Sequence, residues 1–289
     1  MDFMSIITAV LLLGGLGLAF GLVLAGASKI FYVETDPRLD ALNECLPGAN
    51  CGGCGYPGCG GYAEAVLAGE APIGKCASGG NECAMAMSAI MGVKAEAVAR
   101  KVALVKCSGQ KTYDETGAQV GGAKVKGIYE GFRDCLAASK VGGKGPLSCQ
   151  YGCLGFGTCT KVCKYDAIHV IDGVAKVDVE KCVGCGACAS ACPRKLITFV
   201  EYGTDVIIAC NSNAKGAVTA RSCTAGCIGC GLCKKICPEG AITVEKGLAT
   251  IDYTKCKSCG LCATVCPKHL IADARIKNDE DPIPAPNKV

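Results

Sequence analysis

The sequence predicts an α+β fold that begins with one long apolar helix and continues as small units built around groups of cysteines. Three observations support this prediction. Residues 3–28 carry no charged side chain, the 289-residue chain contains 26 cysteines that occur mostly in C-x-x-C groups, and short alternating apolar stretches separate these groups. Aromatic residues make up only 5% of the chain, so we expect small units organised around inorganic groups rather than one large apolar core.

The apolar run "FMSIITAVLLLGGLGLAFGLVLAGAS" predicts a single membrane span. Its 26 residues would reach about 39 Å as a helix, which exceeds a hydrocarbon core of about 30 Å. A cleaved signal peptide is the alternative because "AGA" at 25–27 resembles a cleavage site, but no basic residue precedes the run. Lys29 and Arg38 follow it, so the positive-inside rule predicts that the rest of the chain faces the cytoplasm, where thiols stay reduced.

Charge and motifs argue against several other functions. The formal net charge is +4, which is too small to indicate a nucleic-acid partner. The part of the chain after the apolar run contains neither a P-loop nor a G-x-G-x-x-G motif following a strand, so no nucleotide site is predicted. No nucleophile–base arrangement stands out, and no catalytic residue is assigned.

The first cysteine group follows the apolar run and predicts a four-thiolate metal site. Its spacing is C-x2-C-x4-C-x16-C, with Cys51, Cys54, Cys59 and Cys76 as candidate ligands. Glycines between the first three allow the backbone to fold tightly around a bulky group and to direct amide groups at sulfur. This motif alone leaves tetrahedral zinc open as an alternative to an iron–sulfur cluster.

Three later motifs are more specific. The runs that begin at residues 182, 227 and 256 read C-x2-C-x2-C-x3-C-P, the spacing of bacterial ferredoxins that carry two [4Fe–4S] clusters. The alternating stretches "AIHVIDGVAKVD", "LITFVEYG" and "AITVEKGLATID" lie between motifs and predict paired strands. We therefore expect two tandem ferredoxin-like units.

In such units, three cysteines of a run hold one cluster and the fourth reaches the other cluster. The resulting ligand sets are Cys227, Cys230, Cys233 and Cys266; Cys256, Cys259, Cys262 and Cys237; and Cys182, Cys185, Cys188 and Cys163.

The fourth run, "CLGFGTCTKVCK", is irregular. Phe156 occupies the second cysteine position, and Lys164 replaces the usual proline. The set formed by Cys153, Cys159 and Cys192 therefore lacks a ligand. We expect Cys149, just upstream, to supply it, and a three-iron cluster is the alternative.

Six cysteines remain outside these sets: Cys45, Cys83, Cys107, Cys135, Cys210 and Cys223. An internal repeat involves some of them, since "ALVKCSG" around residue 107 resembles "VIIACNS" around residue 210, and "CQYGC" resembles "CTAGC". Buried thiols acting as small apolar residues would account for them. A sixth cluster, with Cys107, Cys135, Cys210 and Cys223 as extra ligands, is the alternative to a total of five.

The order of these segments resembles the RnfB family, the B subunits of Rnf complexes, in the longer form with two ferredoxin units. The resemblance covers nearly the whole chain. It implies an electron-transfer subunit of an ion-translocating ferredoxin:NAD oxidoreductase in the cytoplasmic membrane. Such a protein would accept electrons from reduced soluble ferredoxin and relay them to other Rnf subunits, coupled to Na⁺ or H⁺ translocation. A membrane-anchored polyferredoxin subunit of another oxidoreductase and a zinc-stabilised scaffold are the alternatives.

The predicted domain organisation follows from these assignments. It comprises a transmembrane anchor (1–28), an N-terminal [4Fe–4S] domain (29–100), a connecting segment (101–148), two ferredoxin-like units (149–200 and 201–275) and a disordered tail (276–289).

Overall fold

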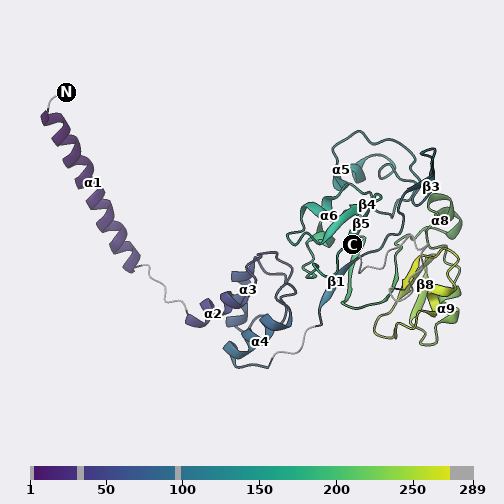
Figure 1. Cartoon of the computed structure of the whole chain (residues 1–289). Helices are drawn as coiled ribbons and strands as arrows, with labels where there is room; N and C mark the ends of the chain where they lie inside the picture. Colours follow the sequence, from purple (N-terminus) through teal and green to yellow (C-terminus); the bar gives the residue numbers. More distant parts are fainter. Residues whose placement is uncertain (1–2, 31–35, 95–98, 274–289) are drawn as a thin grey trace. The chain divides into compact units, whose positions relative to one another are not determined.

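The structure is a computed structural model that describes residues 3–30, 36–94 and 99–273 (Figure 1). The predicted disordered tail, 276–289, lies outside the described residues. The chain divides into two compact units, Met1–Ala41 and Leu42–Val289.

The first unit contains the helix α1 (Phe3–Ile30), which is apolar on all sides. Leu11, Leu16 and Leu22 each expose more than half of their surface, so this helix has no core of its own to pack against. In the part of the chain that the structure describes, α1 is the one helix long and apolar enough to span a membrane, with a mean hydropathy of 2.0 over Leu11–Lys29. This finding agrees with the predicted anchor.

Three helices follow: α2 (Pro37–Cys45), α3 (Cys59–Leu67) and α4 (Gly80–Met91). Leu42, Tyr62, Val66 and Met87 are fully buried there and form a small core. The Tyr62 hydroxyl donates to the carbonyl of Pro72 at 2.9 Å and accepts the N–H of Lys75 at 3.1 Å. Tyr62 therefore fixes the loop that leads to Cys76.

Two β-hairpins follow along the chain. They consist of β4 (Ile168–Ile171) with β5 (Val174–Val177), and β8 (Ile242–Glu245) with β9 (Leu248–Ile251). Each turn has two residues with positive φ, Asp172-Gly173 and Lys246-Gly247, which is the type I′ geometry that suits the twist of a hairpin. The predicted pairing of these alternating stretches is confirmed.

A second strand pair accompanies each hairpin. The strand β1 (Lys101–Val105) pairs with β6 (Ile197–Glu201), and β7 (Val206–Ile208) pairs with β10 (Ile271–Asp273), both antiparallel. The expected connecting segment, 101–148, thus contains a strand, β1, that pairs with a strand of the predicted unit 149–200. Its other elements are β2 (Thr112–Tyr113), β3 (Gln119–Gly121) and α5 (Cys135–Lys140).

Four very short helices carry the cysteine runs, and α8 precedes the third run. The four are α6 (Thr158–Lys161), α7 (Ala187–Ala191), α9 (Leu232–Ile236) and α10 (Leu261–Thr264), and α8 comprises Gly216–Ser222. Those four cysteine-bearing helices each follow a glycine with positive φ, at 157, 186, 231 and 260. The glycine in each motif therefore supplies the turn that ends the cysteine loop and starts the helix.

Introducing charged residues into α1 tests whether this helix spans a membrane. Replacing Leu16 and Leu18 together by lysine should release the chain from membranes, because each lysine at the centre of a span costs about 2.5–3.5 kcal/mol on insertion. The measurement is the fraction of chain that stays with carbonate-washed membranes when it is produced without other subunits. The alanine pair at the same positions is the control and should stay bound. Equal retention of the lysine pair would contradict a spanning helix.

Candidate metal centres

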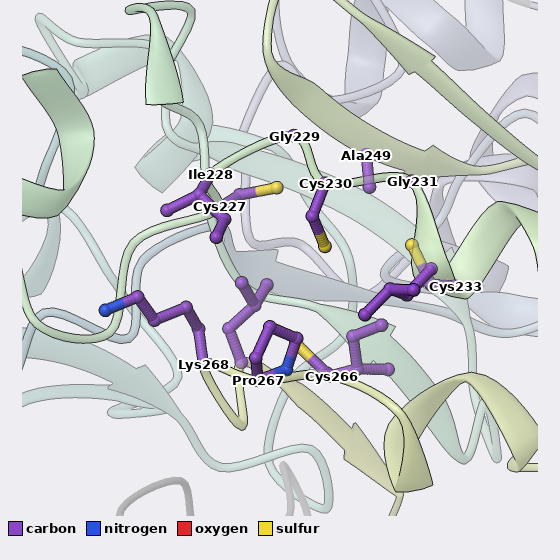
Figure 2. A pocket seen from close by; sticks show the side chains of 13 residues that line it. Cys227, Ile228, Gly229, Cys230, Gly231, Cys233, Ala249, Cys266, Pro267 and Lys268 are labelled. Carbon is purple, nitrogen blue, oxygen red and sulfur yellow. The ribbon is translucent and has the colours of Figure 1, made fainter. Parts of the chain in front are cut away.

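The third cysteine run and the last one contribute to a single cavity. Figure 2 shows the side chains of Cys227, Cys230, Cys233 and Cys266 around this cavity, together with apolar neighbours such as Ile228. These are the four cysteines that the crosswise pairing predicts for one cluster. The last cysteine reaches the cavity because α10 turns the chain back beside α9, and Pro267 follows immediately.

A second cavity, in the N-terminal part of the larger unit, brings together the four cysteines predicted there: Cys51, Cys54, Cys59 and Cys76. The Asn50 side chain accepts the backbone N–H of Cys59 at 2.8 Å, which fixes the start of α3. The Tyr62 contacts described above fix the loop that carries the fourth cysteine. Side chains therefore position both ends of the ligand set: the exposed Asn50 at Cys59 and the buried Tyr62 near Cys76.

A third cavity belongs to the irregular run and contains a cysteine that the spacing did not identify as its ligand. It is lined by Cys135, Cys153, Cys159 and Cys192. Asp134 explains why Cys135 is there: its carboxylate accepts the hydroxyl of Thr158 at 2.7 Å, and that hydroxyl accepts the N–H of Cys135 at 2.7 Å. These bonds tie the start of α5 to the start of α6, which carries Cys159.

Phe156, at the position of the missing cysteine, packs under the same segment. Its ring lies 5.2 Å from that of Tyr129, and both belong to a cluster with Ala138 and Leu154. An apolar residue at this position therefore helps to hold the segment that brings Cys135 to the cavity.

Cys149, the expected fourth ligand, lies elsewhere. It lines a fourth cavity together with Cys107, Cys210 and Cys223. The structure thus exchanges Cys149 and Cys135 relative to the expectation from sequence. Nothing in the spacing indicated this exchange, because the deciding contacts join segments more than twenty residues apart.

In the two remaining predicted ligand sets, the thiols lie close enough together to raise one another's pKa. Burial raises the pKa of Cys188 to about 11, and the charges of Cys182, Cys185 and Cys163 add to this effect. Burial and the charges of Cys256 and Cys259 likewise raise the pKa of Cys262 to about 11. Cys237, the fourth predicted member of that set, packs against the same core.

Cys45 and Cys83 line none of the four cavities. Cys83 is buried in α4, and its thiol donates to the sulfur of Met87 at 3.8 Å. A hydrogen bond with the Cys76 thiol raises the pKa of Cys83, so Cys83 contacts a candidate ligand of the N-terminal cavity as well as the apolar core.

The chemistry of these sites fits iron–sulfur clusters. All 26 cysteines, each within the described residues, are free thiols. Burial raises the pKa of Cys159 to about 12, with neighbouring thiolates adding to the rise, so such a group loses its proton only when a cation compensates the charge. Among the described residues, no group of three or more His, Cys, Asp or Glu side chains could hold a single metal ion. The thiols surround cavities instead, as a multi-iron cluster requires.

Backbone amides also point at the candidate ligands. The N–H of Ala103 lies 3.4 Å from the sulfur of Cys182, and that of Ala175 lies 3.5 Å from the sulfur of Cys153. Hydrogen bonds to sulfur stabilise the anionic form of a cluster and help to set its potential.

The N-terminal cavity adjoins the second cysteine run. Cys185 also lines that cavity, and a Cβ atom on Gly53 would come within 2.0 Å of the Cys185 carbonyl oxygen. Lys164, which replaces the usual proline, donates to the carbonyl of Ala49 at 2.6 Å. The N-terminal ligand set thus lies directly against the loop of the Cys182 set.

Comparison with known proteins supports this assignment. Three families match: "Putative Fe-S cluster" over residues 46–78, "4Fe-4S binding domain" over 175–198 and "4Fe-4S dicluster domain" over 226–270. The chain is 47% identical over 254 residues to the B subunit of the Na⁺-translocating ferredoxin:NAD⁺ oxidoreductase complex of Acetobacterium woodii, covering 88% of this chain and 73% of the relative. It is 41% identical to the B subunit of the proton-translocating complex of Clostridium ljungdahlii, covering 83% and 82%.

A third relative is the B subunit of the ion-translocating oxidoreductase complex of Methanosarcina acetivorans, 38% identical with 87% of this chain and 92% of the relative covered. The chain belongs to the RnfB family. The expected resemblance is confirmed, and the matched iron–sulfur families include four of the five cysteine groups. The irregular run of this RnfB chain, 153–164, lies outside all three matches.

The presence of Cys135 in the third cavity, in place of Cys149, can be tested by mutation. Replacing Cys135 by alanine should convert the cluster of Cys153, Cys159 and Cys192 to a three-iron form or remove it, a loss of about one to four irons per chain. Adding Phe156→Cys to this variant should restore iron, because it recreates the regular spacing. Iron and sulfide analysis with EPR measures both. The control is Cys45→Ala, and iron unchanged by Cys135→Ala would contradict the assignment.

Proposed function

We propose that this chain is the iron–sulfur electron-transfer subunit of a membrane-bound, ion-translocating ferredoxin:NAD oxidoreductase of the Rnf type. It accepts electrons from reduced soluble ferredoxin and relays them to the other subunits. The observation that carries this proposal is that three cavities each bring together the four cysteines of one set, in a chain of the RnfB family. [4Fe–4S] clusters supply one-electron chemistry at potentials that the protein tunes.

The protein's own residues hold and insulate these clusters. The proposed ligand sets are Cys51, Cys54, Cys59 and Cys76; Cys135, Cys153, Cys159 and Cys192; Cys163, Cys182, Cys185 and Cys188; Cys227, Cys230, Cys233 and Cys266; and Cys237, Cys256, Cys259 and Cys262. Hairpins and short helices fix the loops, and apolar side chains exclude water. Five clusters follow from these sets.

In this proposal, successive parts of the chain have separate tasks. Residues 1–28 anchor it in the cytoplasmic membrane as a single span, and the larger unit faces the cytoplasm. The N-terminal cluster domain comprises 29–100, and two tandem ferredoxin-like units follow. The strand β1 belongs to the first of these, because it pairs with β6. Residues 3–28 contain no ionisable side chain, so the Na⁺ or H⁺ path lies in partner subunits.

The proposal is tested on the tagged full chain purified anaerobically from its own membranes. We expect multi-span, flavin-containing subunits to co-purify and the complex to reduce NAD⁺ with reduced ferredoxin. Cys182→Ala should lower this activity to background, whereas Cys45→Ala should preserve it. Co-purification with a different oxidoreductase that cannot reduce NAD⁺ would support a polyferredoxin subunit of another complex instead. Stoichiometric zinc with little iron would indicate a scaffold.

The close contact at Gly53 gives a second test. Gly53→Ala should lower ferredoxin-dependent NAD⁺ reduction several-fold without changing iron content, because the added Cβ must move away from the Cys185 carbonyl and widen the gap between two ligand sets. Gly142→Ala is the matched control, since a Cβ there meets nothing within 4 Å. Unchanged activity of the Gly53 variant would show that electrons do not cross this contact.

A further inference from the structure

The fourth cavity is lined by cysteines that belong to none of the five proposed sets: Cys107, Cys149, Cys210 and Cys223. None of these lies within 46–78, 175–198 or 226–270, the regions that match iron–sulfur families. Its empty volume is about 330 Å³, against 350–370 Å³ for the three cavities that hold proposed sets. The fourth cavity thus resembles the others in size and in donor set.

Backbone geometry at this cavity also matches that of the proposed ligands. The sulfur of Cys107 accepts the N–H of Gly109 at 3.4 Å and that of Cys153 at 3.3 Å. The sulfur of Cys210 accepts the N–H of Cys227 at 3.4 Å. Two amides directed at one sulfur stabilise a thiolate there. The equivalence of Cys107 and Cys210 follows the internal repeat, since each follows the strand, β1 or β7, that precedes a cysteine run.

The walls of the cavity come from both halves of the larger unit and are joined by hydrogen bonds. Ala123 and Cys223 form an antiparallel bridge, and the N–H of Gly122 donates to the hydroxyl of Thr224 at 2.8 Å. On the other side, the buried hydroxyl of Ser108 donates to the carbonyl of Ala209 at 2.7 Å. These contacts join residues next to Cys107, Cys210 and Cys223 to other walls of the cavity.

The backbone at Gly152 lines this cavity next to the irregular run. A Cβ there would lie 3.4 Å from the sulfur of Cys149 and 3.6 Å from that of Cys107, in ordinary contact with both. Both sulfurs thus lie on the same side of this backbone segment. Arg194 donates to the carbonyl of Cys149 at 3.1 Å and brings a positive charge beside it. A fixed cation beside the cavity favours an anionic group within it.

We propose that Cys107, Cys149, Cys210 and Cys223 hold a sixth [4Fe–4S] cluster between the two ferredoxin-like units. This inference rests on the proposed function and extends it. The new site is one hydrogen bond away from a ligand set in each unit, because the N–H of Cys153 donates to the sulfur of Cys107 and the N–H of Cys227 donates to that of Cys210. A cluster there joins the two units into one continuous series.

The experiment counts clusters on the full chain, purified anaerobically in detergent and reconstituted with iron and sulfide. Native mass spectrometry should show six clusters as the highest occupancy, and chemical analysis should show about 24 irons with matching sulfide. Cys210→Ala and Cys107→Ala should each reach five clusters and about 20 irons. Cys45→Ala, which changes a cysteine outside every cavity, should reach six.

The outcomes separate this inference from the proposed function. A wild-type maximum of five clusters, or six clusters in both alanine variants, overturns the sixth site and leaves the other five sets intact. Five clusters with one zinc overturns it as well. Zinc with little iron in the wild type overturns the proposed function itself. The wild-type count decides even if one variant fails to fold.

Discussion

The structure depends on bringing many cysteines together in small apolar cavities, where the thiolate form that binds metal is unfavourable unless a cation compensates its charge. Burial alone raises the pKa of thiols such as Cys159 and Cys223, and neighbouring thiolates raise it further. Iron lowers the pKa of such a cysteine because it binds the thiolate form directly. Strands of two to five residues and cysteine-bearing helices of four or five residues give little core of their own. Cluster binding is therefore a large part of what stabilises the fold.

The same contact between a cysteine loop and a hairpin turn occurs in two parts of the chain. Beside both hairpins, a glycine of a cysteine loop lies against the glycine of the hairpin turn: Gly155 against Gly173, and Gly229 against Gly247. A Cβ at either loop position would come within 3.0 Å of backbone atoms of that turn. The hairpin turn thus supports the cysteine loop, which explains why glycine occurs at these positions and why the hairpins precede or follow each run so closely.

The sequence indicates which cysteines gather together where they lie on one local loop, and it does not indicate a cysteine that another segment brings to the same cavity. The regular runs are predictable because the three cysteines and the glycine of one loop determine its geometry. Cys135 is not, because a hydrogen-bonded contact between Asp134 and Thr158 brings it to its cavity. Cys149 lies only four positions before Cys153, yet it lines the fourth cavity, beside Cys107. Proximity in sequence was the misleading signal.

The two departures from the regular ferredoxin motif have structural partners. Phe156 packs on Tyr129, in the same cluster as Cys135, so an apolar residue stands at the regular cysteine position where another segment brings a cysteine to the cavity. Lys164 replaces proline and bonds to the carbonyl of Ala49 in the N-terminal domain. Proline has no amine to reach across this contact. Each irregularity of the run 153–164 thus marks a point where this run contacts another part of the chain, the segment of Tyr129 or that of Ala49.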